Sequence, residues 1–227
     1  MKRSLILVFI FVIIILGGLI ILFHGKRPEQ ELKVPLVEPK EISMEEKVLQ
    51  NKKIAMIVAF RDFRDEEYFI PKEILEGAGA EIVSVSTFAG KATGVEGGEV
   101  KIDLLIDDLK VDDFDAIVFI GGPGAKNYLE DERMHTLAQE ALSKGKVLAA
   151  ICIAPAILAK AGVLEGRKAT VWSSALDKSA IRILEEEGAQ YSEGEVIVDG
   201  KIVTASGPPA AKEFAEKIKD LLTEDLI

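Results

Sequence analysis

The sequence predicts an α/β fold, a three-layer sandwich in which a mostly parallel sheet carries helices on both faces. Short apolar, β-branched runs occur at 54–60, 114–120 and 146–151, and such runs are typical of strands buried on both faces. Residues 125–144 separate two of these runs and place apolar side chains at helical spacing. Strands that alternate with helices in this way favour a parallel sheet covered on both sides.

The remaining elements continue the alternation. After the first strand we expect a helix over 67–78 and a second strand over 81–87. The other predicted elements are a hairpin or small excursion at 91–109, a short helix at 153–161, a turn and strand at 163–172, a helix at 177–187, a hairpin at 195–205 and a last helix that begins near 208. In parallel sheets ligands bind beyond the carboxyl ends of the strands, so the loops after 120 and 151 are the expected place for a site.

The composition limits the classes of function. The formal net charge is −10, from 38 acidic and 28 basic side chains, and an acidic surface repels phosphate backbones, so nucleic acid is not expected as a partner. A single cysteine excludes an internal disulfide and a cysteine-based metal cluster. Because the chain also lacks a dinucleotide-binding glycine pattern, we expect neither a metal nor another cofactor.

The N-terminal region differs from the rest of the chain. Residues 4–23 contain no charged side chain, and a helix of that length covers about 30 Å, the thickness of bilayer hydrocarbon. The sequence therefore predicts a transmembrane anchor over 1–23 and a single-pass membrane localisation. The charged, proline-containing residues 24–50 are expected to form a tether, and 51–227 the globular domain. The short tail before the apolar stretch favours a domain outside the cytoplasm.

Cys152 stands where a buried strand stops and a helix begins, within the sequence AICIAP at 150–155. A nucleophile at such a turn is presented outward, and the N–H of the next residue faces the same point. The N-terminal end of the helix favours the thiolate, and Pro155 suits a first helical turn. Taken alone, a cysteine in an apolar stretch is more often a small core residue.

Two motifs together resemble the ThiJ/PfpI superfamily, whose members are related to glutamine-amidotransferase domains. They are IVFIGGPGA at 117–125 and AICIAPAILAKAGVLEGRKAT at 150–170. The resemblance runs from about Lys53 to Leu222. It implies a flavodoxin-like sandwich with a cysteine nucleophile elbow, favours Cys152 as the reactive centre, and implies a homodimer or higher homo-oligomer.

The resemblance also implies an acidic partner for the cysteine. Family members carry a glutamate four residues before a proline, and here Glu67 stands four residues before Pro71, with Glu66 as the alternative. A carboxyl buried beside a thiolate has a raised pKa and can donate a hydrogen bond to the sulfur. Without the motif, the acidic residues at 65–67 are better explained as favourable charges at a helix N-terminus.

The glycine loop offers a place for a negatively charged oxygen. Gly121 and Gly122 let the backbone approach a ligand closely, although a tight turn would also need glycine there. The N–H groups of Gly122 and Ile153 are the candidates for an oxyanion site.

The chain departs from the family in its histidines. Peptidase-like members have a histidine directly after the cysteine, where this chain has Ile153. Glyoxalase-like members supply a histidine from the next strand, and here Trp172 occupies the matching place. Trp172 is a candidate for lining the substrate pocket or for a contact between subunits, although a lone tryptophan is more often a core residue. Neither His24 nor His135 is placed to replace it. Without imidazole, peptide hydrolysis loses the acid for its leaving amine.

Three functions follow from these features. The first is a cysteine-dependent enzyme of the glyoxalase or deglycase kind, with small reactive carbonyls or their adducts as substrates. The second is a redox sensor or chaperone-like stress protein in which Cys152 reports oxidation or the domain binds clients without turnover. The third, a cysteine peptidase or amidase, is disfavoured by Ile153.

Overall fold

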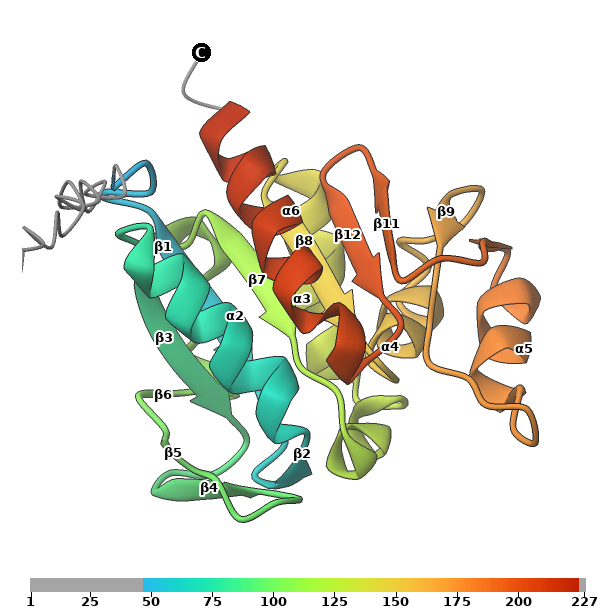
Figure 1. Ribbon diagram of the computed structural model, residues 1–227, viewed down its shortest axis with the longest axis horizontal. Helices are drawn as coiled ribbons and strands as arrows, with labels where there is room; N and C mark the ends of the chain where they lie inside the picture. The colour runs from blue at the N-terminus through green and yellow to red at the C-terminus, as the bar shows by residue number, and fades with distance from the viewer. Residues whose placement is uncertain (1–46, 225–227) are drawn as a thin grey trace, which may run out of the picture. The chain divides into compact units, whose positions relative to one another are not determined.

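The computed structural model describes residues 47–224, which fold around a seven-stranded sheet (Figure 1). The strand order is β11-β12-β8-β7-β1-β3-β6. Neighbours in this sheet are parallel except for the β11–β12 pair. The strands span Lys53–Ile57 (β1), Glu81–Ser86 (β3), Leu104–Leu105 (β6), Ala116–Phe119 (β7), Val147–Ile151 (β8), Val196–Asp199 (β11) and Ile202–Ala205 (β12).

Helices cover both faces of this sheet, which makes the fold the predicted flavodoxin-like sandwich. The helices α2 (Asp65–Gly77) and α6 (Ala211–Glu224) pack side by side on one face, and α3 (Glu132–Ser143) and α4 (Pro155–Lys160) lie on the other (Figure 1). α5 (Ser179–Glu186) packs against α4. Every residue of β7 and β8 is buried, because these central strands have helices above and below.

Smaller elements complete the described chain. β2 (Arg61–Phe63) pairs with β4 (Lys91–Gly94), and β4 forms the predicted hairpin with β5 (Glu99–Lys101). The predicted hairpin near the C-terminus is the antiparallel β11–β12 pair. The remaining short elements are β9 (Lys168–Ala169), β10 (Gln190–Tyr191) and the 3₁₀ helices η1 (Ile106–Asp108), η2 (Val111–Asp113), η3 (Pro123–Tyr128) and η4 (Pro208–Ala210).

Two predicted elements are shorter in the structure. The helix expected over 125–144 is divided, with η3 first and α3 beginning only after Asp131, whose side chain caps it by accepting a hydrogen bond from Arg133 N–H at 3.0 Å. The strand expected within 163–172 is reduced to the two residues of β9. The N–H of Trp172 instead donates to Cys152 O at 2.8 Å, which draws this segment toward the cysteine turn.

The predicted membrane localisation is corrected by the structure. No helix within residues 47–224 is long and apolar enough to cross a bilayer. α6, with 14 residues, falls short of the roughly 20 residues that a bilayer requires. The segment 4–23, to which the anchor was assigned, and most of the predicted tether lie outside the described residues. Leu49, at the end of that tether range, is buried, and its N–H donates to Ala78 O at 2.9 Å.

Candidate active site

Cys152 occupies a strained turn directly after β8. Its φ of 64° lies in the left-handed region, which costs a non-glycine residue about 1–3 kcal/mol and persists only where the surroundings enforce it. Two hydrogen bonds do so here: Cys152 N–H donates to Ala205 O at 2.8 Å, and Cys152 O accepts from Trp172 N–H at 2.8 Å. The chain then turns into α4, which begins three residues later at Pro155. This is the geometry of a nucleophile elbow.

Glu67 reaches the cysteine from the first turn of α2. Its side chain is fully buried, and its carboxyl lies close enough to the thiol to raise the pKa of Cys152. The start of α2 is held by Asp65, which accepts hydrogen bonds from Glu96 N–H and Gly98 N–H at 2.8 Å each. Of the two glutamates considered, Glu67 is therefore the one placed beside Cys152.

Gly121 provides the space that brings the acid and the thiol together. A Cβ atom at this position would lie 2.6 Å from each of Cys152 Cβ, Glu67 Oε2 and Ile151 O. Gly121 O also accepts from Arg64 N–H at 3.1 Å, which joins the loop after β7 to the start of α2. Glycine is therefore required here because any side chain would fill the space between Cys152 and Glu67. This reason adds to the one expected from the sequence, the close approach of the backbone to a ligand.

Burial governs the protonation of this pair. Burial raises the pKa of Glu67 to about 8, against the opposing effects of Cys152, Arg64 and the Gly121 N–H. Neither carboxyl oxygen has a hydrogen-bond partner of standard geometry among the described residues, although Cys152 and the Gly121 N–H lie beside them. A buried carboxylate so poorly paired is unfavourable, so the neutral acid is the stable form at pH 7.

The same burial contradicts the prediction that Cys152 is a thiolate. Burial, followed by the charge of Glu67, raises the pKa of Cys152 to about 12, and the N–H groups of Gly122 and Ile153 only partly oppose this. The helix that was expected to stabilise the anion has six residues and begins beyond the turn. At pH 7 the pair therefore holds two protons, and the sulfur becomes anionic only as its proton is transferred.

Cys152 lies at a pocket of about 140 Å³ that also involves Arg64, Gly122, Pro123, Lys126, Ile153 and Trp172. Cys152 is largely buried, with 9% of its surface exposed, and it is one of the residues that line this pocket. Gly122, Ile153 and Trp172 were expected here from the sequence, whereas Arg64 and Lys126 were not. The only available signal for these two was their position in loops at the carboxyl edge of the sheet, three residues before Glu67 and two residues after Gly124.

No imidazole lines this pocket within residues 47–224. His135 is largely buried on α3, where its Nε2 atom lies 2.8 Å from Leu129 O. Trp172 is half-buried at the pocket. His24 lies outside the described residues. The same part of the chain contains no group of three acidic, histidine or cysteine side chains that could hold a metal ion.

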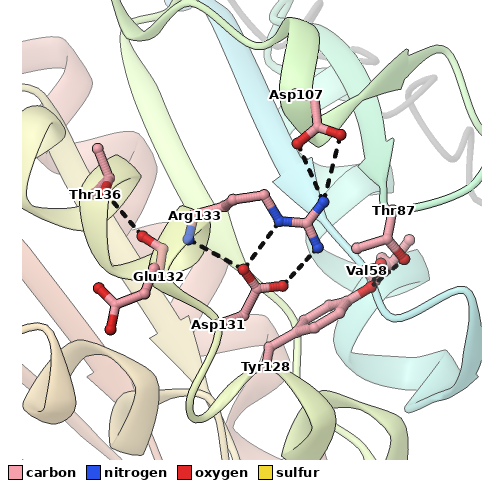
Figure 2. A network of polar contacts seen from close by, with 8 residues as sticks. All are labelled: Val58, Thr87, Asp107, Tyr128, Asp131, Glu132, Arg133 and Thr136. Atoms are coloured by element: carbon pink, nitrogen blue, oxygen red, sulfur yellow. Dashed lines mark hydrogen bonds and ion pairs between the residues drawn. The ribbon is translucent and has the colours of Figure 1, made fainter.

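A second, larger cavity of about 310 Å³ lies next to the polar network of Figure 2. Arg133 at its wall donates to Asp107 at 3.1 Å and to Asp131 at 2.7 Å. Tyr128 OH lies 3.2 Å from Thr87 Oγ1 and 3.3 Å from Val58 O. This cavity is lined by two arginines, Arg133, which is neutralised by two carboxylates, and Arg61, which lies over the Phe60 ring, and its lining residues include no cysteine.

A flavodoxin-like sandwich with a cysteine elbow and a buried glutamate at its carboxyl edge defines a class of α/β proteins with a paired thiol and carboxyl. Residues 52–221 match the sequence profile of the DJ-1/PfpI family, and the chain belongs to that family.

Relatives of known name and structure support this assignment. The chain is 34% identical over 168 residues to deglycase PH1704 of Pyrococcus horikoshii, covering 72% of this chain and 98% of that protein. The crystal structure of a ThiJ/PfpI domain protein from Brachyspira murdochii superposes with a TM-score of 0.72 at 34% identity, covering 77% of this chain and 98% of the other. Oxidized DJ-1 of Toxoplasma gondii superposes with a TM-score of 0.64 at 30% identity, over 76% and 95% of the two chains.

Proposed function

We propose that this protein is a cysteine-dependent enzyme acting on small 2-oxoaldehydes or their adducts, in the manner of a glyoxalase or deglycase. The observation that carries the proposal is the placement of Glu67, neutral at pH 7, beside the thiol of Cys152 at a small pocket. The relative from Pyrococcus horikoshii named a deglycase supports the same class of chemistry. A homodimer, implied by the resemblance, belongs to this proposal and is testable by light scattering.

The first step is addition of the thiol to the aldehyde. Cys152 Sγ forms a bond to the aldehyde carbon, and the thiol proton passes to the carbonyl oxygen through the Glu67 carboxyl, which gives a hemithioacetal. The N–H groups of Gly122 and Ile153 point toward the sulfur, so they are close to any oxygen on the carbon that sulfur attacks. A neutral acid suits this step because it can donate one proton while accepting another.

The second step moves hydrogen between the two carbon atoms. Glu67 removes the proton from the former aldehyde carbon and returns one proton to the ketone oxygen, which forms an enediol. Protonation of the second carbon, with loss of the hydroxyl proton on the carbon bound to sulfur, then gives a thioester of a 2-hydroxy acid. Water cleaves the C–S bond and restores the thiol. One carbon is oxidised and its neighbour reduced, so the net reaction is addition of one water and needs no external oxidant.

Turnover of methylglyoxal to lactate by the full chain is the direct test. The unmodified protein is expected to produce lactate, and Cys152→Ala and Cys152→Ser to reduce this to the uncatalysed rate because the nucleophile is lost. Equal lactate production by the unmodified protein and Cys152→Ala, or none by either, would overturn the proposal.

A second candidate function is sensing of oxidants. Cys152 lines the pocket, lies beside an acid, and faces two N–H donors that suit a sulfinate oxygen. A DJ-1 of Toxoplasma gondii, 30% identical, has been crystallised in an oxidized form. Each peroxide molecule would add one oxygen to the sulfur and leave as water. Mass spectrometry after peroxide treatment should show two added oxygen atoms on Cys152, and an unmodified cysteine after prolonged treatment would exclude this function.

A further inference from the structure

The pocket at Cys152 has a positively charged lining in an otherwise acidic protein. The chain carries a net charge of −10, yet the charged side chains that line this pocket are Arg64 and Lys126, with no acidic residue among the lining residues. Arg64 directly precedes α2, and Lys126 belongs to η3, so two separate loops each contribute one cation. Glu67 lies behind the thiol and adds no negative charge while its carboxyl is protonated.

Neither cation is strongly neutralised by neighbouring groups. Arg64 approaches Glu96 at 3.9 Å, and both side chains are partly exposed, so this pair contributes little. The side chain of Lys126 makes no ion pair or hydrogen bond within residues 47–224. The pKa of Asp177 is lowered mainly by its hydrogen bonds to Ser179, with only a through-space contribution from Lys126. Both charges are therefore available to a ligand in the pocket.

The dimensions of the pocket indicate the size of that ligand. A volume of about 140 Å³ holds roughly four or five water-sized groups, since each water occupies about 30 Å³ of liquid. This is enough for a short carbon chain and a carboxylate. A guanidinium binds a carboxylate through two parallel hydrogen bonds, and an ammonium adds a point charge.

We propose that Arg64 and Lys126 select substrates that carry a carboxylate a few bonds away from the carbonyl attacked by Cys152. The preferred substrate class is then a small anionic 2-oxoaldehyde. This specificity rests on the proposed function, but the charge of the pocket acts on any reagent that reaches the sulfur.

Paired substrates test the specificity. In 2-oxopentanal a methyl group replaces the carboxylate of 4,5-dioxopentanoate, so the ratio of their kcat/KM values isolates the charge. We expect the unmodified full chain to favour the anion by about 10- to 100-fold, the range for a charge-assisted hydrogen bond. Lys126→Met should lower this ratio about two- to fivefold, the range for an exposed ion pair, and Lys126→Glu should lower it further; Lys126 is exposed, so its replacement leaves the core unchanged.

A matched control separates local charge from net charge. Lys110 is exposed and lies just before η2, which leads into the amino end of β7, so it sits at the sheet edge opposite to Cys152. Lys110→Met makes the same change in net charge and should retain the substrate ratio of the unmodified protein. The same ratio in Lys126→Met, Lys126→Glu and Lys110→Met would overturn the proposal.

Alkylation of the single cysteine keeps the two proposals distinguishable. Iodoacetate and iodoacetamide both form an Sγ–carbon bond with loss of iodide and of the thiol proton, and they differ in the charge of the reagent. For each protein, the rate with iodoacetate is divided by the rate with iodoacetamide, and this ratio is divided by the corresponding ratio for glutathione. The normalised ratio should exceed one in the unmodified protein. It should fall in Lys126→Met, drop below one in Lys126→Glu, and decrease with added salt because the lysine is exposed.

The combination of results has a definite meaning in each case. A selective alkylation without turnover of either aldehyde would reject the proposed enzyme and retain the anion-selective pocket. Turnover with alkylation ratios that are identical in all variants would retain the enzyme and reject the role of Lys126.

Discussion

The Cys152 pocket and the Arg133 cavity lie at the same edge of the sheet and differ in how Lys126 and Arg133 are paired. The Arg133 cavity is the larger, at about 310 Å³ against about 140 Å³, and Arg133, one of the two arginines that line it, is held by Asp107 and Asp131. In the smaller pocket, Arg64 approaches Glu96 at 3.9 Å and lies near the buried Glu67, and Lys126 has no ion-pair partner in the described chain. Polar groups that already satisfy one another stabilise the fold, whereas groups left available can act on a ligand.

Replacement of Glu67 tests the reactive side of this comparison and has the largest expected effect. Glu67→Gln retains the shape of the side chain but cannot transfer a proton, so kcat/KM for methylglyoxal should fall by about 10²- to 10⁴-fold. Glu66→Gln is the matched control, because it removes a neighbouring carboxyl from the same helical turn. Equal losses in the two variants would show that Glu67 has no special place in the reaction.

The same variant should change how stability depends on pH. The pKa of Glu67 is raised from 4.5 to about 8, so the folded protein binds more protons than the unfolded chain between these values. This carboxyl therefore lowers the free energy of unfolding as pH rises, by up to about 1.4 kcal/mol per pH unit, until the group is ionised in both states above its folded pKa. Urea unfolding from pH 5 to pH 9 should show a smaller fall in Glu67→Gln than in Glu66→Gln.

A methyl group at Gly121 should have an intermediate effect. It would collide with Cys152, Glu67 and the backbone of Ile151, so Gly121→Ala should lower the free energy of unfolding by about 1–3 kcal/mol and disturb the acid–thiol pair. Gly77→Ala is the contrasting change, because no atom lies within 4 Å of the added carbon and the residue is helical. It should stabilise the protein by about 0.5–1 kcal/mol. Denaturant unfolding of both variants measures these two opposite changes in the free energy of unfolding.

Removal of the Arg133 charge should have the smallest effect. Arg133 is about half exposed and its pairs are partly solvated, so Arg133→Met should lower the free energy of unfolding by about 0.2–1 kcal/mol. Activity on methylglyoxal should stay within about twofold of the unmodified protein, because this residue lies at the other cavity. A loss comparable to that of Glu67→Gln would break the distinction between the two regions.

Much of the fold was predictable because its signals are local. The apolar run at 146–151 predicts a buried strand whatever follows it, and β8 lies there as expected. The start of α3 was missed because apolar spacing continues backward through η3, while the helix itself begins at the cap provided by Asp131. The strand expected near Trp172 was largely absent because a long-range hydrogen bond to Cys152 competes with strand pairing.

The sequence by itself determined the order of strands and helices and the presence of a lone cysteine at a turn, since periodicity and residue type are properties of neighbouring positions. Only the tertiary structure decided that Cys152 keeps its proton at pH 7 beside the protonated Glu67, because burial depends on atoms supplied by several elements. It also decided that Arg64 and Lys126 share a pocket while Arg133 is neutralised. Charges that are distant in the sequence come close enough to interact only when the chain folds.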